Sequence, residues 1–364
     1  MFIKSQRIIT ASERGSLQEM CHRILSQTSA DSLLKISFFH YAANDKEYLE
    51  ILDTLHSVVR NFFSGNPPLM SYIAQRTEND SLVAEVTYLE DKDTVIERHT
   101  NYILLTDCKC KEIITSGIVP HDVSRTAFEQ STEIFDTISN ILQKNGFLPS
   151  DIYRQWNYIQ YITDGKDGSQ NYQEFNDARS IFYNSCDWGN GYPAATGIGT
   201  SAGGIMVELC AIKDSDVANK PIDNPLQIAA HNYSQKVLDG KVIGTLQERT
   251  TPKFERARLL GGTIYISGTA AIKGEESNFS DDAVEQTAET MEIMDRLVAT
   301  DNIPVENNGS AYDLLRVYVK REDDIAPIAQ YMHTHYPTTA KHYLVADVCR
   351  PELLVEIEGI AHIL

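Results

Sequence analysis

The chain has 364 residues, of which 42% are hydrophobic and 23% charged, a composition typical of a folded globular protein of about two or three domains. Its formal net charge of −19 opposes binding to nucleic acid or to an anionic membrane surface, because both of these partners are negatively charged. A small anionic substrate would therefore need a local group of arginine and lysine side chains.

No segment approaches the roughly 18 consecutive apolar residues that span a bilayer. The first residues also lack the long apolar core of a signal peptide. The six cysteines are scattered, and none has the spacing of a zinc site. We therefore predict a cytoplasmic protein without structural zinc, another metal or a cofactor.

Residues 1–100 are predicted to form a degenerate unit. A short helix is predicted around residues 21–25 and a strand over 35–41. Asn44 is typical of a helix N-cap, and apolar residues continue at helical spacing to residue 62. Strands are predicted over 69–76 and 82–89, and Asn79-Asp80 between them indicates a hairpin turn. The unit thus looks shortened to a strand, one main helix and a hairpin.

Residues 101–215 are predicted to form a second unit. It begins with strands over 102–106 and 112–116, followed by a helix that Ser124 caps and Asn145-Gly146 ends. A strand over 152–163, a helix over 172–183 and a glycine-containing strand over 191–199 come next. Gly203-Gly204 predicts a tight turn into the strand that contains Glu208.

Residues 216–255 form a predicted linker in which polar and aromatic side chains are dense, as in loops that carry functional sites. Residues 256–364 are predicted to form a third unit. Its expected elements are a strand over 263–270, a helix over 282–299 capped by Asp281, a strand over 314–320, a helix over 323–331 and strands over 341–348 and 354–358. Each complete unit is therefore strand, helix, strand, helix, strand, strand.

A similar strand ends each unit, with one glutamate among apolar residues. These glutamates are Glu85, Glu208 and Glu356, and each strand follows a segment that begins with proline. The pattern indicates an internal triplication of about a hundred residues per unit.

The last strand carries two carboxylates. Glu356 and Glu358 share one face of it, because alternate residues of a strand point the same way. With Cys349, Arg350 and Lys341 nearby in sequence, they are candidates for proton transfer. The same alternation also fits the solvated face of an edge strand, since carboxylates are mostly exposed.

The order of elements, with Gly268-Thr269-Ala270 ending a strand, resembles the reactive-intermediate deaminase (Rid/YjgF) fold. The resemblance implies an α+β fold in which each sheet has two helices on one face. It also implies a catalytic Glu356, while the arginine usual in that family falls on Lys341. Three such units in one chain predict a pseudo-threefold core, a monomer or weak oligomer, and a site between the third unit and a neighbour.

Over residues 150–364 the chain resembles the chorismatases, which are built from Rid-like domains and remove pyruvate from chorismate. The matching stretches are residues 192–199, 224–230, 252–257, 268–272 and 347–357. His231-Asn232 and Glu255 depart from the family pattern. The resemblance implies catalytic roles for Glu356 and Cys349. It implies substrate binding by Arg256, Arg350, Tyr233, Arg179, Lys341 and Gly268.

The expected reaction is donation of a proton from Glu356 to the enol ether of chorismate, with burial and Glu358 raising the pKa of Glu356. A cysteine at position 349 implies 3-hydroxybenzoate as product, rather than the dihydrodiol. Two alternatives are an imine or enamine deaminase on the same fold, and a non-catalytic protein that binds a small ligand. A ribonuclease is disfavoured by the acidic charge.

Overall fold

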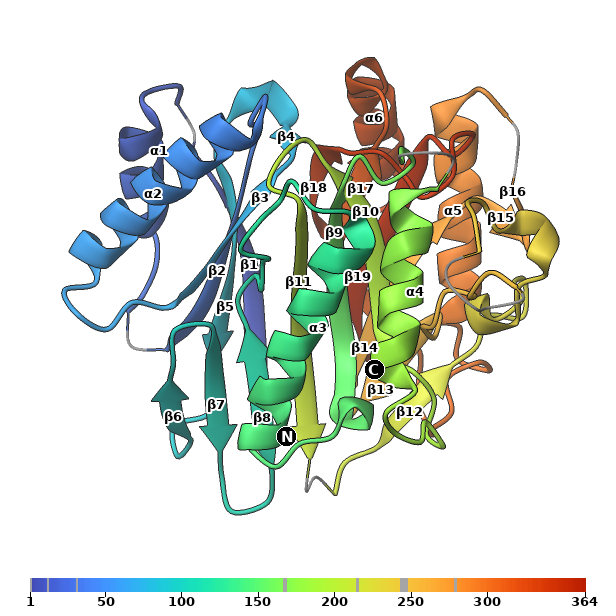
Figure 1. Cartoon of the computed structure of the whole chain (residues 1–364), viewed down its shortest axis with the longest axis horizontal. Helices are drawn as coiled ribbons and strands as arrows, with labels where there is room; N and C mark the ends of the chain where they lie inside the picture. The colour runs from blue at the N-terminus through green and yellow to red at the C-terminus, as the bar shows by residue number, and fades with distance from the viewer. Residues whose placement is uncertain are drawn as a thin grey trace.

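The computed structural model describes residues 2–11, 13–30, 32–165, 169–213, 216–242, 248–277 and 280–364. Figure 1 shows three sheets that meet at the centre of the molecule, with pairs of helices outside them. Each sheet and its two helices form one unit, and the three units follow one another along the chain. None of the helices within these ranges is long and apolar enough to cross a membrane.

The first unit contains a sheet in the order β1-β5-β2-β3 and two helices. Its elements are β1 (Lys4–Thr10), α1 (Leu17–Leu25), β2 (Leu33–His40), α2 (Asp45–Phe62), β3 (Leu69–Ala74), β4 (Arg76–Thr77) and β5 (Val83–Leu89). Ser16 and Glu19 form a capping box at the start of α1. Asn44 caps α2, as predicted, by accepting a hydrogen bond from the Glu47 N–H at 3.0 Å.

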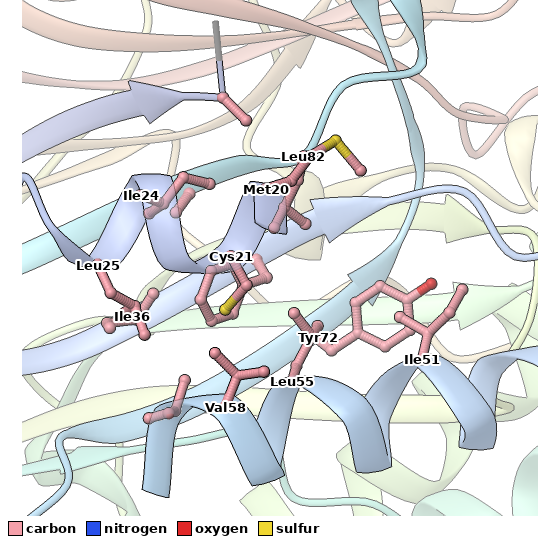
Figure 2. Close-up of a cluster of buried hydrophobic side chains, with 14 of the residues drawn as sticks. Met20, Cys21, Ile24, Leu25, Ile36, Ile51, Leu55, Val58, Tyr72 and Leu82 are labelled. Atoms are coloured by element: carbon pink, nitrogen blue, oxygen red, sulfur yellow. The ribbon is translucent and has the colours of Figure 1, made fainter. Parts of the chain in front are cut away.

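The two helices of this unit lie against the same face of its sheet. Figure 2 shows Cys21 of α1 pointing toward Leu55 and Val58 of α2, and Ile24 of α1 and Ile36 of β2 belong to the same buried cluster. Four of these five side chains are wholly buried, and Val58 is 7% exposed. The amphipathic spacing of each helix therefore accounts for its place on the sheet.

The structure corrects two expectations for this unit. It is not shortened to one main helix and a hairpin, since it also has β1 and a full α1. The predicted hairpin is wrong, because β2 lies between β3 and β5 and pairs with both. The chain instead leaves the sheet at β4, which pairs with β18 of the third unit, and turns back through Asn79 and Asp80 with positive φ. A pairing with a distant strand has replaced the local one.

The second unit has a sheet in the order β10-β9-β11-β8-β7-β6. Its elements are β6 (Val95–Arg98), β7 (Tyr102–Thr106), β8 (Lys111–Thr115), α3 (Ala127–Lys144), β9 (Ile152–Gln160), α4 (Asn171–Tyr183), β10 (Ala194–Thr200) and β11 (Ile205–Lys213). Thr126 rather than Ser124 caps α3, because its side chain forms a capping box with Glu129. Gly203 and Gly204 have positive φ at the predicted turn into β11.

The third unit has a sheet in the order β12-β13-β14-β19-β17-β18-β4. Its elements are β12 (Asn219–Ile222), β13 (Ala257–Leu260), β14 (Thr263–Ala270), β15 (Ile272–Lys273), β16 (Glu276–Ser277), α5 (Ala283–Leu297), β17 (Ser310–Val319), α6 (Ile325–His335), β18 (Ala340–Val345) and β19 (Val355–Ile363). Asp282, not Asp281, caps α5. β19 lies between β14 and β17, so the edge-strand alternative for Glu356 is excluded.

The three sheets share one topology. Their common strands follow the orders β3-β2-β5-β1, β10-β9-β11-β8 and β18-β17-β19-β14. Each set is connected as strand, helix, strand, helix, strand, strand. The predicted α+β fold with a pseudo-threefold arrangement in one chain is therefore confirmed.

Three buried ion pairs form a ring where the sheets meet. Each joins a basic residue on the central strand of one unit to a glutamate of the next unit: Lys35 to Glu208 at 2.9 Å, Arg154 to Glu358, and Arg316 to Glu85 at 2.6 Å. All six side chains are at most 9% exposed. Glu358, rather than Glu356, thus takes the place of Glu85 and Glu208, and the predicted alignment of the repeat is wrong by two residues.

The backbone pairing gives the same register. In the third unit the residue after Gly268 pairs with Ile357, and in the second unit the residue after Gly117 bridges to Val207. Glu358 and Glu208 each follow these partners by one residue. A shift of two residues keeps every side chain on the same face of a strand, so alternation in the sequence cannot distinguish the two alignments.

Candidate active site

An enclosed pocket lies between the second and third units. Its walls come from α4 and β10 of the second unit, from β14 and β19 of the third, and from residues 233–239 and 252–256, here called the connector. Its free volume is about 60 Å³. Typical ligand pockets measure roughly 300–1,000 Å³, so a substrate enters only when side chains or the connector move apart.

Glu356 lies on β19 and lines this pocket with only 5% of its surface exposed. Burial, and then the negative charge of Glu358, raise the pKa of Glu356 to about 8, which Arg154 opposes. Among the described residues, no hydrogen bond or ion pair engages the Glu356 carboxyl. At neutral pH this side chain therefore holds a proton that it can donate into the pocket.

Gly268 makes room for this carboxyl. A Cβ at position 268 would overlap Oε1 of Glu356 and lie 3.1 Å from Cγ2 of Thr196. The Gly268 N–H donates a hydrogen bond to Oγ1 of Thr196 at 3.0 Å, which holds β14 close to β10. The absence of a side chain at position 268 thus lets Glu356 reach the pocket.

Glu358 differs sharply from Glu356, although both lie on the same face of β19. Its carboxylate accepts hydrogen bonds from Arg154, from Thr196, from Arg316 Nη1 at 2.9 Å and from the Tyr318 hydroxyl at 2.8 Å. It is 2% exposed and does not line the pocket. Glu358 is therefore a fixed negative charge beside the acid.

Two arginines line the pocket without a carboxylate partner among the described residues. Arg256 Nη2 donates to the carbonyl of Ile228 at 2.5 Å and to the Tyr233 hydroxyl at 2.7 Å. Arg350 Nη1 donates to the carbonyl of Glu275 at 2.9 Å and to Oγ of Ser277 at 2.8 Å. Glu275 interacts with Arg350 electrostatically, but neither arginine has a carboxylate at salt-bridge distance within the described residues, and this favours an anionic ligand.

Tyr233 and Cys349 complete this side of the pocket. The Tyr233 ring lies 5.4 Å from the guanidinium carbons of both Arg256 and Arg350. Burial, and then Glu356, raise the pKa of Cys349 to about 12. Cys349 is therefore a neutral thiol at physiological pH, which is not the form that acts as a nucleophile.

Two other predicted residues lie outside the pocket lining. Arg179 is buried on α4 behind Asn176, to which it donates a hydrogen bond at 2.6 Å, and its Nε has no partner within the described residues. Lys341 donates from Nζ to the carbonyls of Tyr336 and Thr339, at 2.7 and 2.8 Å. The structure thus brings six predicted residues together and leaves out these two.

The pocket also contains residues that were not predicted. Tyr172 and Asn176 come from α4, Leu238 from the connector and Phe254 from just before Arg256. Asn176 is 1% exposed, so it is a polar residue on the buried side of a helix. Such a residue needs a polar partner or a ligand, and Arg179 supplies a hydrogen bond here. The signal in the sequence was the density of polar residues in α4, where Gln173 and Asp177 are buried too.

Both departures from the chorismatase pattern fall beside the pocket rather than in it. Glu255 accepts a hydrogen bond from the Tyr192 N–H at 2.8 Å, and the His231 ring packs against the Tyr192 ring with centroids 5.4 Å apart. Both residues therefore contact Tyr192, which is itself outside the pocket lining. Across the described ranges, no group of three or more His, Cys, Asp or Glu side chains is placed to hold a metal ion.

The chain is similar in sequence to one protein family and to proteins from Streptomyces. The family model described as "Chorismatase FkbO/Hyg5-like, N-terminal" matches residues 93–211. A 3-hydroxybenzoate synthase of Streptomyces hygroscopicus is 29% identical over 248 residues, which are 64% of this chain and 69% of that protein. A chorismatase of Streptomyces rapamycinicus is 31% identical over 244 residues, which are 63% of this chain and 67% of that protein.

A solved structure also matches almost the whole chain. The crystal structure of a chorismatase covers 99% of this chain and 98% of its own, with a TM-score of 0.73 and 21% sequence identity. At that identity the likeness concerns the fold, and it includes all three units.

Proposed function

This chain belongs to the chorismatase family, and from that membership and the geometry of its pocket we propose that it converts chorismate to pyruvate and a hydroxybenzoate, with 3-hydroxybenzoate as the product. The observation that carries the proposal is the buried Glu356, which stays protonated at neutral pH beside two arginines that lack carboxylate partners in the described chain. Chorismate offers the complementary groups, two carboxylates and an enol ether.

The first step assigns Glu356 as general acid. Its proton passes to the methylene carbon of the enol ether, which leaves a positive charge shared between carbon and oxygen. Arg256 and Arg350 bind the carboxylates, with Tyr233 as a further hydrogen-bond donor. Water adds to the cation and returns one proton to the Glu356 carboxylate, and the resulting neutral hemiketal collapses to pyruvate and the ring alcohol.

The water balance distinguishes the two products. Pyruvate and hydroxybenzoate together contain the atoms of chorismate, so the diol first formed must lose one water for each water added. Pyruvate and the dihydrodiol contain one water more. A closed pocket of about 60 Å³ that Cys349 lines supports the first outcome, because it leaves little room for additional solvent.

Cys349→Ala is expected to shift the product toward the dihydrodiol. Removing the thiol leaves space next to Glu356, and a water there would protect the diol from dehydration. Chromatography of the products gives the ratio directly. Cys210→Ala, which alters a cysteine outside this pocket, is the matched control and should leave the ratio unchanged.

Turnover is expected to fall as pH rises through about 8. The proton donor is the protonated form of Glu356, and its pKa is raised to about 8, so the active form is present below that pH and lost above it. The pH profile of kcat measures this directly. A flat profile between pH 6 and about 10 would exclude a carboxyl with this pKa as the donor.

Gly268→Ala is expected to lower kcat by about 10²-fold with the fold intact, since a misplacement of roughly 1 Å has an effect of that size. The new methyl group would push away the Glu356 carboxyl, whose flexible end can move. Gly117→Ala is the matched control, because its methyl group would overlap the Met206 side chain instead. Equal turnover of the two variants would contradict the role of Gly268.

Incubation of the purified protein with chorismate tests the proposal as a whole. Pyruvate is measured with a coupled dehydrogenase, and the aromatic product by its absorbance. One equivalent of each per chorismate supports it. Bound but unchanged chorismate would indicate a binding protein, and hydrolysis of 2-aminoacrylate-type imines without pyruvate from chorismate would indicate a deaminase.

A further inference from the structure

A second cavity, of about 600 Å³, lies between the first and second units. α2 and β3 form one side, and the segment after β8 forms the other, as α4, β10 and β14 do in the pocket. The Gly117 N–H donates to Oγ of Ser71 at 2.9 Å, just as the Gly268 N–H donates to Thr196. This cavity is therefore the pseudo-threefold counterpart of the pocket.

The two sites differ at the position of the general acid. A Cβ at Gly117 would overlap Sδ of Met206, and a Cβ at Gly268 would overlap Oε1 of Glu356. Met206 thus occupies the place of the proton donor. A thioether cannot supply a proton, so this cavity can bind a ligand but cannot perform the same step.

The polar side chains of the cavity are basic or neutral. Arg60 and Arg98 line it together with three histidines, His56, His99 and His121, and no described lining residue is an aspartate or glutamate. Arg98 Nη2 donates to the carbonyl of Leu33 at 2.9 Å, and its buried Nη1 has no partner within the described chain. Burial and then Arg60 lower the pKa of His56, and His121 pairs with Glu133, so the positive charge comes from the two arginines. On a chain with net charge −19, two arginines on one surface favour an anion.

The rest of the lining combines uncharged polar residues, among them Asn101 and Thr137, with apolar ones. The Tyr48 and Tyr72 rings stack with centroids 4.9 Å apart and planes 21° apart. Met70, Met206 and Val119 add unbranched or small apolar surface. The two tyrosine rings are occupied by each other, so a planar apolar body would lie against the methionine side chains, because thioethers adapt to ring edges.

We propose that this cavity is a second, non-catalytic binding site for a small planar carboxylate, held by Arg98 with Arg60 at the rim. The volume is in the range of roughly 300–1,000 Å³ that ligand pockets occupy, so this site accepts a ligand without rearrangement. The inference does not rest on the turnover of chorismate, because binding is its only claim.

Titration calorimetry of the full chain with benzoate tests it. We expect wild-type protein to bind benzoate, and Arg98→Met to weaken that binding at least about tenfold through loss of a charge-assisted hydrogen bond. The same titrations are made on Arg256→Met protein, because the pocket that contains Arg256 is proposed to form a hydroxybenzoate and would itself bind benzoate. Arg256→Met should retain binding to the second cavity. Turnover of chorismate by Arg98→Met should equal that of the wild type.

Val119→Trp is a second variant of the same cavity, which tests the proposal even if Arg98→Met does not fold. Val119 is 45% exposed and lines the cavity, so an indole there fills the site without removing a buried contact. It should also abolish benzoate binding. The proposal is overturned if Arg256→Met protein binds no benzoate, or if adding either Val119→Trp or Arg98→Met to it leaves that binding unchanged.

Discussion

Glu356→Gln is expected to lower the turnover of chorismate by about 10²–10⁴-fold, the range that a positioned general acid contributes. Glutamine keeps the size and shape of the side chain but has no acidic proton. Because the Glu356 carboxyl makes no hydrogen bond or ion pair within the described residues, its replacement removes no structural contact. Steady-state release of pyruvate measures the loss, and circular dichroism checks the fold.

Glu352→Gln is the matched control. Glu352 lies four residues away on the loop before β19, is partly exposed and does not line the pocket. It should have wild-type turnover. If Glu356→Gln retained wild-type activity, another group would have to be the proton donor.

Glu358→Gln is expected to destabilise the protein by about 3–5 kcal/mol, the usual effect of removing one partner of a buried ion pair. Arg154 would lose its only ion-pair partner in the described chain, and Arg316 would keep only Glu85. Urea unfolding followed by tryptophan fluorescence measures this, since the Trp156 ring lies 4.6 Å from the Arg154 guanidinium. Asp301→Asn is the control, because it removes an exposed ion pair with Arg296. It should leave the urea concentration at the midpoint of unfolding unchanged.

The same variant has a second effect. The charge of Glu358 is one of the causes that raise the pKa of Glu356, so its removal should lower that pKa. The fall in kcat with rising pH should then begin at a lower pH than in the wild type. An unchanged profile together with unchanged stability would contradict the account of Glu358 as a fixed charge in the ring.

Local signals predicted the elements well where caps and amphipathic spacing coincide. Asn44 starts α2 as expected, and Gly146 has positive φ at the end of α3. β1 was missed because its residues, most of them partly exposed, show little alternation of apolar and polar side chains. The hairpin failed for another reason, since the pairing of β4 with β18 joins residues more than two hundred positions apart.

The site could be predicted in part. Glu356, Cys349 and Arg256 could be predicted because they lie within sequence stretches that resemble the chorismatases. All three line the pocket. Tyr172 and Asn176 could not be found that way, because only the packing of α4 against the third unit brings them there. Buried charges inside strands, such as Arg154 and Arg316, were a signal that was overlooked, since each requires a partner from another unit.

Four expectations stay predictions. They are the catalytic and binding roles of the site residues, the division of the chain at residues 100, 215 and 255, the cytoplasmic location, and the sufficiency of a monomer or weak oligomer. The closed topology of three units in one chain is compatible with a monomer, and sedimentation of the purified protein would measure its oligomeric state.

Because the three units belong to one polypeptide, each of their contacts is encoded separately. In an assembly of identical subunits, any substitution appears at every equivalent boundary at once. Here one boundary contains Glu356 and another contains Met206, while the ion pairs that join neighbours are retained all the way around. Gene duplication followed by fusion thus allows a symmetric body to hold an asymmetric set of sites, each free to change without altering the others.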